Sequence, residues 1–215
     1  MFYNILSRKR KAILPLFKSL KNDFYLAGGT ALALQIGHRD SIDFDFFSKK
    51  SFDTNILFEK IKNIFKNENH KIQKVQDEGN TLTVIADNDI KISFFAYNYP
   101  LLKPLITDKY LNIASIEDIA CMKLSAITSR STAKDYVDIY FVLQNKKLPV
   151  LLNFAQKKFP SLDRNLILKS LVYFDDVAEE PIIFKNNNVV SFNEVKASLQ
   201  KAVKDFMNSS ASKHK

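Results

Sequence analysis

The stretch IDFDF at residues 42–46 decides the fold of this chain. In a β-strand successive side chains point to opposite faces, so its three apolar residues share one face while Asp43 and Asp45 share the other. The apolar face can be buried, but two like charges need a cation, hydrogen-bond donors or solvent between them. Two carboxylates roughly 6 to 7 Å apart along a strand suit a divalent metal ion. The alternative is a polar strand face that only meets solvent.

A glycine pair precedes this strand, between a strand expected at 24–27 and a helix expected at 30–36, which Gly37 would end. Gly28 and Gly29 let the backbone approach an anion. Thr30 adds a hydroxyl at the helix N-terminus, where backbone N–H groups favour phosphate. A glycine pair can also be no more than a tight turn. Metal and phosphate together indicate nucleotidyl or phosphoryl transfer.

The composition is that of a globular protein. The 215 residues are 46% hydrophobic and include 18 Phe, enough for one large domain or two small ones. No apolar run reaches the roughly 18 to 20 residues of a membrane span, and no apolar region of a signal peptide follows the basic N-terminus. The single cysteine, Cys121, cannot form an internal disulfide, and no Cys/His spacing indicates zinc. We expect a cytoplasmic protein that does not bind a membrane.

The formal net charge is +9, from 32 Lys and Arg against 23 Asp and Glu. Such an excess permits a polyanionic partner such as RNA. The lysines are nevertheless spread along the whole chain. A gene with an AT-biased base composition encodes many lysines and would give the same excess of positive charge. Charge alone therefore leaves nucleic-acid contact open.

Hydrophobic periodicity predicts a sheet-forming part followed by a helical part. Further strands are expected at 71–76, 81–86 and 90–97, after which the loop around Pro100 and Pro104 ends the sheet. Helices are expected at 4–20, 52–65, 115–129, 133–143, 149–158, 163–171 and 192–207. The helix at 52–65 should bury Ile56, Leu57, Ile61, Ile64 and Phe65. The class is therefore α+β, with a sheet domain at 1–110, a helical domain at 111–208 and a polar tail at 209–215.

Three blocks of the sequence together resemble a known family. They are LAGGTALAL at 26–34, HRDSIDFDFF at 38–47 and SIEDIACMKLSAITSRSTAKDYVDIYFVL at 115–143. In this order and spacing they resemble the AbiEii-type nucleotidyltransferase toxins of the polymerase-beta-like superfamily. The resemblance implies a mixed nucleotidyltransferase sheet flanked by helices and followed by a C-terminal helical part. It also implies Mg²⁺-dependent transfer of a nucleotide from an NTP to an acceptor.

The resemblance gives each of the first two blocks a role. Asp43 and Asp45 would coordinate Mg²⁺ against the NTP phosphates, and Gly28, Gly29 and Thr30 would bind the triphosphate. Family members act as toxins of bacterial toxin–antitoxin or phage-defence systems, which adds a cognate antitoxin to the candidate partners. Some relatives modify tRNA 3′ ends, so the implied acceptor is RNA, tRNA in particular, or a protein.

The last block holds four charged candidates. Lys123 borders the apolar stripe of its helix, where it would grip the triphosphate or stabilise the leaving group, unless it only snorkels from the core edge. Asp135 matches an acidic position that the family uses near its site, and it could activate the acceptor or hold Lys123 or Arg130. Asp135 and Asp138 could instead serve the helix dipole. Arg130 could contact phosphate or pair with these aspartates.

Arg39 and His38 directly precede the aspartate strand. Arg39 could bind phosphate or RNA, or it could merely neutralise Asp43 and Asp45. His38 is expected to be structural.

One position departs from the superfamily. Polymerase-beta-like enzymes usually carry a third carboxylate on a later strand, where it serves as general base. The equivalent position here is expected to be Ser93, and serine cannot do this at neutral pH. The base assignment therefore stays open, with Asp135 as the best substitute.

The favoured function is an Mg²⁺-dependent nucleotidyltransferase toxin that acts on RNA or protein. One alternative is a small-molecule nucleotidyltransferase of the aminoglycoside-modifying type, whose acceptor pocket would be acidic. The other is a catalytically silent NTP- or RNA-binding module, which Ser93 would explain.

Overall fold

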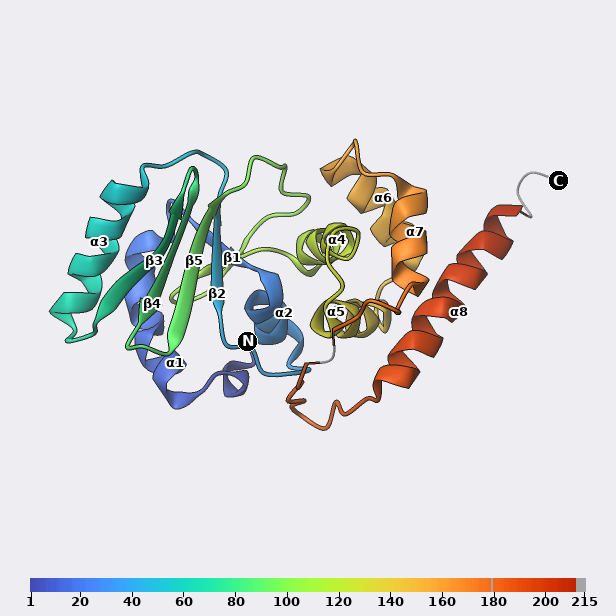
Figure 1. Cartoon of the computed structure of the whole chain (residues 1–215), viewed down its shortest axis with the longest axis horizontal. Coiled ribbons are helices and arrows are strands. Elements are labelled where there is room, and N and C mark those ends of the chain that lie inside the picture. Colours follow the sequence, from blue (N-terminus) through green and yellow to red (C-terminus); the bar gives the residue numbers. More distant parts are fainter. Residues whose placement is uncertain (179, 212–215) are drawn as a thin grey trace. The chain divides into compact units, whose positions relative to one another are not determined.

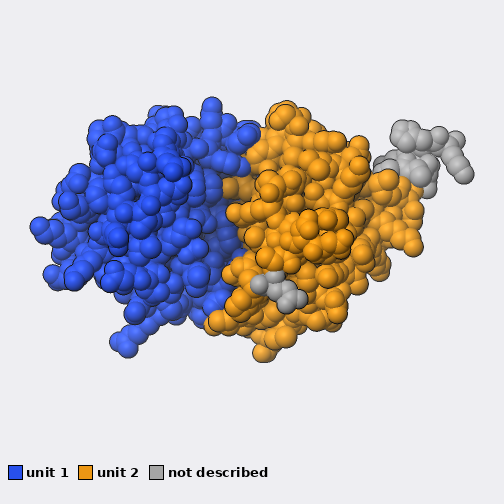
Figure 2. All heavy atoms as spheres, in the orientation of Figure 1, with its two compact units in different colours: residues 1–115 blue, residues 116–215 orange. Residues whose placement is uncertain are grey.

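The computed structural model describes residues 1–178 and 180–211. Its contacts divide the chain into two compact units, Met1–Ser115 and Ile116–Lys215, which Figure 2 shows in separate colours. Unit 1 holds the β-sheet and unit 2 is built from helices. The division expected from the sequence lies a few residues earlier, near residue 110.

The N-terminal segment is not the single helix expected at 4–20. It consists of a short 3-10 helix η1 (Tyr3–Ile5), an α-helix α1 (Arg8–Ile13) and a second 3-10 helix η2 (Leu14–Leu20). Ser7 is extended and its side chain accepts a hydrogen bond from a backbone N–H of α1, so the α-helix starts only after it. Pro15, in the first turn of η2, has no N–H to continue the α-helical pattern.

Unit 1 contains a seven-stranded sheet in the order β3-β4-β5-β2-β1-β7-β6. β2 pairs in parallel with β5 and β1 with β7, while the other neighbours are antiparallel. The bounds are β1 Tyr25–Ala27, β2 Phe44–Ser48, β3 Ile72–Glu78, β4 Thr81–Ala86, β5 Ile90–Ala96, β6 Ile106–Thr107 and β7 Asn112–Ile113. Every expected strand has a counterpart. The expectation that the sheet ends near Pro100 is wrong, because β6 and β7 extend it beyond β1.

One face of the sheet is buried under aromatic side chains. Phe44 and Phe46 of β2 and Phe94 of β5 are at most 2% exposed. The ring of Phe17, from η2, lies 5.0 Å from that of Phe44 and 4.8 Å from that of Phe46. Each such pair adds about 0.5–1.5 kcal/mol to the free energy of burial. Because strand residues alternate, this burial turns Asp45 to the other face.

Two apolar residues that were expected in the core are exposed. Ile42 is 52% exposed, because β2 begins only at Phe44. Ile56 is 72% exposed, although it belongs to the helix α3 (Thr54–Asn67) as expected. The buried stripe of that helix follows the spacing i, i+4, i+8 through Leu57, Ile61 and Phe65. Ile56 precedes this stripe by one residue and is rotated away from it by about 100°.

Caps define the two helices that connect strands of unit 1. Gly37 ends α2 (Gly28–Ile36) with a φ of 70°, which confirms the expected stop. The Asp53 side chain accepts hydrogen bonds from two backbone N–H groups at the start of α3. α2 packs against β1 and β2, and α3 packs against β3 and β4 (Figure 1).

Unit 2 consists of α4 (Ile116–Ala126), α5 (Ala133–Leu143), α6 (Leu148–Lys158), α7 (Arg164–Val172) and α8 (Phe192–Ala211). α4 packs on α5 and α6, and α8 packs on α5, α6 and α7. Thr128 and Ser129 donate their hydroxyls to carbonyls of the last turn of α4, which ends earlier than expected.

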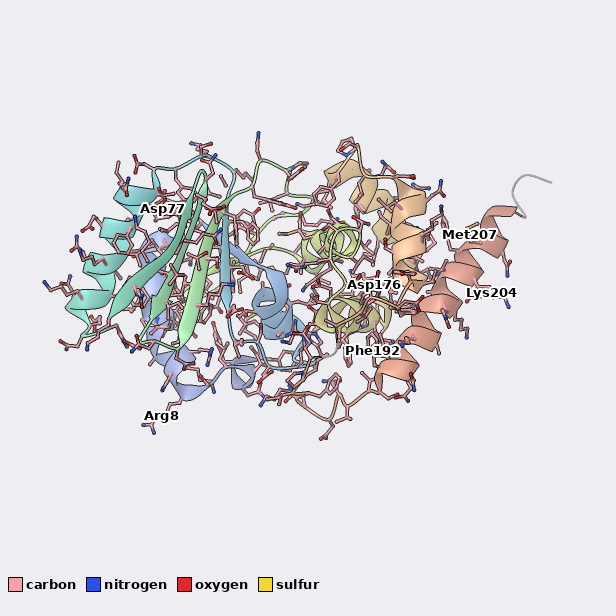
Figure 3. The ribbon with its side chains drawn as sticks, in the orientation of Figure 1. Arg8, Asp77, Asp176, Phe192, Lys204 and Met207 are labelled. Atoms are coloured by element: carbon pink, nitrogen blue, oxygen red, sulfur yellow. The ribbon has the colours of Figure 1, made fainter. Side chains whose placement is uncertain are left out.

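The C-terminal helix α8 has one buried and one exposed side. Val195 and Leu199 are buried, whereas Met207 is 53% exposed and projects near Lys204 (Figure 3). α8 reaches Ala211, and residues 212–215 of the expected polar tail lie outside the described part of the chain. None of the helices described in the structure is long and apolar enough to cross a membrane.

Candidate active site

The glycine turn and the aspartate strand meet where β1 pairs with β2. The register places Ala27 opposite Asp45. Gly28 follows with a φ of +70°, and a Cβ atom there would lie 2.8 Å from Asp45 Oδ2. Only glycine fits this place, because of both the backbone conformation and the close carboxylate. The turn therefore brings the main chain directly against the Asp45 side chain.

Arg39 fills the space beside the second glycine of the turn. A Cβ atom on Gly29 would lie 2.6 Å from Arg39 Nη2. Arg39 is 3% exposed, and its Nη1 donates to the Asp40 carbonyl at 2.8 Å. The guanidinium thus lies at the glycine turn, although its contact with phosphate stays a prediction. His38 is buried at 1% exposure, as a structural residue would be.

Thr30 ties the segment before β2 to α2. It is 2% exposed, and its hydroxyl donates to the Asp43 carbonyl oxygen and lies 2.7 Å from Ser41 Oγ. A hydroxyl has one proton, so Ser41 donates to Thr30 when Thr30 donates to Asp43. Thr30 therefore positions the backbone of Asp43, and its contact with phosphate stays a prediction.

Ser93 lies directly beside Asp45 in the sheet. The parallel pairing of β2 and β5 places the two residues opposite each other, and Ser93 is 1% exposed. The Thr83 hydroxyl from β4 lies 3.3 Å from Ser93 Oγ. Neither β4 nor β5 carries a carboxylate, so these strands supply hydroxyl groups beside Asp45 and no strong base.

Asp43 and Asp45 are the carboxylates of unit 1 that we expect to hold a metal ion. Both are half-buried. Within the described residues no group of three or more His, Cys, Asp or Glu could hold one. Mg²⁺ in phosphoryl-transfer sites is bound through one or two carboxylates together with substrate phosphates. Two half-buried carboxylates two residues apart, with Asp45 at the glycine turn, fit that requirement.

Unit 2 buries the ammonium group of Lys123 between two carboxylates. Lys123 Nζ lies 2.6 Å from Asp135 Oδ1 and 2.8 Å from Asp138 Oδ2. Lys123 is 7% exposed, and the two aspartates are at most 1% exposed. The lysine is therefore held inside the unit by residues of α5, and it does not extend along the surface.

The second carboxylate oxygen of Asp135 accepts two further hydrogen bonds. Arg130 Nε donates to Asp135 Oδ2 at 3.0 Å, and the Thr132 hydroxyl donates to the same atom at 2.8 Å. Burial raises the pKa of Asp135, but the charges of Lys123 and Arg130 and the hydrogen bonds outweigh it, so the pKa lies below its ordinary value. The Arg130 side chain is 61% exposed, which leaves its outer face open to a ligand.

The lowered pKa of Asp135 predicts a pH dependence of stability. A carboxyl group with a lowered folded-state pKa stabilises the fold above the unfolded-state value of 3.8, and this stabilisation is lost as pH falls through the folded-state value. We expect the melting temperature to drop below about pH 4, and to drop less in Asp135→Asn. Thermal unfolding across pH measures this. The exposed Asp205→Asn variant should keep the wild-type acid response, and an equal response in Asp135→Asn would contradict the assignment.

A second buried ion pair was not expected from the sequence. Lys158 Nζ of α6 lies 2.8 Å from Asp118 Oδ1 of α4, and both side chains are 0% exposed. The spacing of Leu151, Ala155 and Lys158 puts this lysine on the buried stripe of α6. This spacing is the feature of the sequence from which the burial of Lys158 could have been predicted. Cys121 is also buried in α4, and burial raises the pKa of its thiol to about 12, so it is inert.

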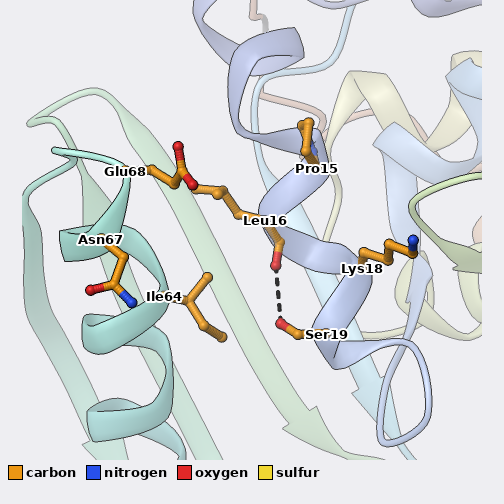
Figure 4. A pocket seen from close by; sticks show the side chains of 7 residues that line it. All are labelled: Pro15, Leu16, Lys18, Ser19, Ile64, Asn67 and Glu68. Carbon is orange, nitrogen blue, oxygen red and sulfur yellow. Dashed lines mark hydrogen bonds between the residues drawn. The ribbon is translucent and has the colours of Figure 1, made fainter.

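An open pocket in unit 1 lies apart from the predicted site residues. It is found between η2 and α3 (Figure 4), and its lining consists of Pro15, Leu16, Lys18, Ser19, Ile64, Asn67 and Glu68. η2 covers the sheet face that carries Phe44 and Phe46, whereas Asp45 lies on the opposite face. The pocket therefore does not define the candidate site.

The structure resembles other solved structures in fold, among them that of a nucleotidyltransferase toxin. MenT4, the nucleotidyltransferase toxin Rv2826c from Mycobacterium tuberculosis H37Rv, matches with a TM-score of 0.63 at 15% identity, over 91% of this chain and 80% of that chain. JHP933 from Helicobacter pylori matches with a TM-score of 0.57 at 18% identity, over 97% of this chain and 98% of that chain. The expected class, a nucleotidyltransferase-type mixed sheet with a helical C-terminal part, is confirmed.

Sequence comparison identifies the family. An uncharacterized protein of Aquifex aeolicus (strain VF5), aq_aa25, is 41% identical over 165 residues, which cover 74% of this chain and 77% of that protein. Residues 16–210 match the family model described as nucleotidyl transferase AbiEii toxin, Type IV TA system. Because this match spans most of the chain and includes both the glycine turn and the Lys123 cluster, the protein belongs to the AbiEii family of nucleotidyltransferase toxins.

Proposed function

We propose that this protein is an Mg²⁺-dependent toxin that transfers a nucleotide from an NTP to an RNA or protein acceptor. The observation that carries the proposal is the close approach of the glycine turn to the Asp45 carboxylate, since it places main chain beside a group that could hold a metal ion. In the reaction an acceptor oxygen bonds to the α-phosphorus of the NTP, and the bond from that phosphorus to pyrophosphate breaks.

The first step of the proposal concerns the triphosphate. Asp43 and Asp45 would hold Mg²⁺, which supplies positive charge against the phosphate oxygens when it is bound. Gly28 and Gly29 would offer their N–H groups to the same phosphates, and Arg39 would add a fixed charge beside them. The bound nucleotide would thus meet positive charge and donors at the end of β1.

The second step concerns the residues of unit 2. The sequence predicts that Lys123 grips the triphosphate or stabilises the leaving group, but its ammonium is enclosed between Asp135 and Asp138, so we assign it to fixing these carboxylates. Arg130 would contact a phosphate with its exposed face. Asp135 has a lowered pKa and pairs with both cations, which makes it a poor proton acceptor. We therefore assign Asp135 the role of holding Arg130 together with Lys123, and the acceptor proton leaves to solvent.

The toxin role rests on the family, whose model is described as part of a Type IV toxin–antitoxin system. A cognate antitoxin is the partner that this role requires. Expression of the chain in a bacterial host should therefore stop growth. Asp43→Ala should relieve the arrest if nucleotide transfer is its cause.

Metal removal tests the chemistry directly. The chain is incubated with each NTP labelled at the α-phosphorus, together with total RNA or a protein extract. We expect label in one acceptor fraction, its loss with EDTA and its return with Mg²⁺, because the proposed metal neutralises the triphosphate. The same NTP labelled at the γ-phosphorus is the control, and it should transfer no label. Absence of transfer from any NTP, with growth inhibition intact in Asp43→Ala, would overturn the proposal.

The position of Ser93 beside Asp45 favours one second candidate, a catalytically silent NTP- or RNA-binding module. Tight NTP binding without turnover in the same assay would support it. An aminoglycoside added as acceptor tests the small-molecule alternative, which requires label on that compound and none on macromolecules.

A further inference from the structure

The sheet face that carries Asp45 continues as a row of aromatic side chains. Residues alternate along β2, so Phe47 follows Asp45 on the same face. The parallel register pairs Asp45 with Ser93 and Phe47 with Phe95. The polar pair is therefore followed directly by an aromatic pair. Tyr97 comes next along the same direction of the chain.

The rings of this row contact one another in sequence. The Phe47 ring stacks on Phe95 at a centroid distance of 5.2 Å and an angle of 29°, and it meets the edge of Tyr97 at 5.2 Å. The Tyr97 ring lies 4.8 Å from that of Tyr99. We call Phe47, Phe95, Tyr97 and Tyr99 the aromatic platform.

The aromatic platform is partly open, unlike the aromatic residues on the opposite face of the sheet. Phe47, Phe95 and Tyr97 are half-buried, and Tyr99 is 44% exposed. On the other face Phe44, Phe46 and Phe94 are closed off in the core. The same two strands thus use aromatic residues for the core on one side and leave ring surface available on the other. Contiguous ring surface of this kind marks a binding site more often than isolated exposed residues do.

Two lysines lie at the end of the aromatic platform that is farther from Asp45. Lys49 and Lys50 follow β2 directly, and both are exposed. The Tyr97 N–H donates to the Ser48 carbonyl at 2.7 Å, so the end of β2 that leads into the lysines lies beside Tyr97. A basic pair next to stacked rings is the combination that binds single-stranded nucleic acid, through phosphates and bases respectively.

We propose that the aromatic platform stacks the unpaired bases of an RNA acceptor, with the reacting nucleotide toward Asp45. The inference rests on the proposed function and deepens it by naming the acceptor class. Phe47 itself lies between the rings of Tyr25 and Phe95, so the bases would stack on the outer members of the platform. A single NTP base would occupy one ring, whereas these outer rings offer room for more than one base. Stacking on aromatic faces is how proteins read unpaired RNA. Lys49 and Lys50 would meet the backbone phosphates of the more distant nucleotides.

Binding to the full chain tests the inference without requiring turnover. Fluorescein-labelled oligoadenylate and oligouridylate are titrated against the wild type, Tyr99→Ala and Tyr97→Leu, with anisotropy as the readout. We expect each variant to weaken single-strand binding about tenfold, the effect of losing one stacked base. A fully paired RNA duplex should bind the wild type more weakly than the single strands, because its bases are not available to the rings.

Tyr173→Ala is the matched control, since Tyr173 is 48% exposed and belongs to unit 2. It should bind RNA as the wild type does, and equal melting temperatures would show that the platform variants fold. Unchanged RNA affinity in both Tyr99→Ala and Tyr97→Leu would overturn the inference. Loss of NTP affinity instead of RNA affinity would also overturn it, because the rings would then hold the NTP base.

The outcome separates this inference from the proposed function. If RNA binds through the aromatic platform while no NTP is transferred, the acceptor site stands and the transferase assignment fails. If transfer occurs and only a protein is labelled, the transferase assignment stands and the platform is not an RNA site.

Discussion

Replacing Asp45 by Asn is expected to lower the rate of nucleotide transfer by about a thousandfold or more. The amide keeps the shape of the side chain but removes the charge that the proposed metal requires, and such metals contribute several kcal/mol of transition-state stabilisation. Asp45 lies so close to Gly28 that a carboxylate from another residue has little room to replace the Asp45 side chain. Initial rates with α-labelled NTP, at saturating Mg²⁺, measure the effect.

Asp23→Asn provides the control for charge removal in the same unit. Asp23 is exposed and forms only a surface ion pair with Lys60, so transfer should stay within about twofold of wild type. Circular dichroism and the melting temperature would show that both variants fold. A rate for Asp45→Asn within tenfold of wild type would mean that the carboxylate pair is not the metal platform.

The largest expected effect on stability comes from the ion pair that α4 and α6 bury. Lys158→Met should lower the free energy of unfolding by about 3–5 kcal/mol, because it leaves Asp118 without its counter-charge in the interior. Asp118 must then either remain charged without the Lys158 ammonium or take up a proton, and both cost free energy. Urea unfolding followed by circular dichroism measures the change.

Two further variants make this result specific. Combining Lys158→Met with Asp118→Leu removes both charges, and it should recover most of the loss since apolar groups replace the pair. Lys62→Met breaks the exposed pair with Glu59 and should cost less than about 1 kcal/mol. A double variant as unstable as Lys158→Met alone would show that packing, and not the unpaired charge, is responsible.

The sequence predicts those parts of unit 1 whose secondary structure is visible in the pattern of apolar and polar residues close together in the chain. The alternation in residues 42–46 correctly assigns Phe44 and Phe46 to the core and Asp45 to the other face. It fails at Ile42, because alternation does not mark the residue at which a strand begins. β6 and β7 have two residues each, too few for an alternating pattern. The N-terminal apolar spacing likewise does not distinguish α-helix from 3-10 helix.

The charged cluster of unit 2 shows where sequence reasoning ends. The sequence nominates Lys123 and Asp135 and offers their pairing as one possibility, but whether they meet depends on how α4 packs on α5. Lys157 and Lys158 are adjacent in the chain, yet one is exposed and the other is fully buried against Asp118. Both are lysines of the same helix, and in the sequence only their spacing from Leu151 and Ala155 separates them. The difference comes from helix phase and from a partner that lies elsewhere in the sequence.

The parallel pairing of β2 with β5 also bears on the order in which the chain folds. β3, β4 and β5 form antiparallel neighbours that are adjacent in sequence, so they can pair early. Asp45 and Ser93 meet only when β5 crosses back to β2, past α3 and the intervening hairpin, and closing so long a loop is slow. We therefore expect the acidic strand to acquire its neighbour late. A chain still emerging from the ribosome would carry both aspartates well before it could use them.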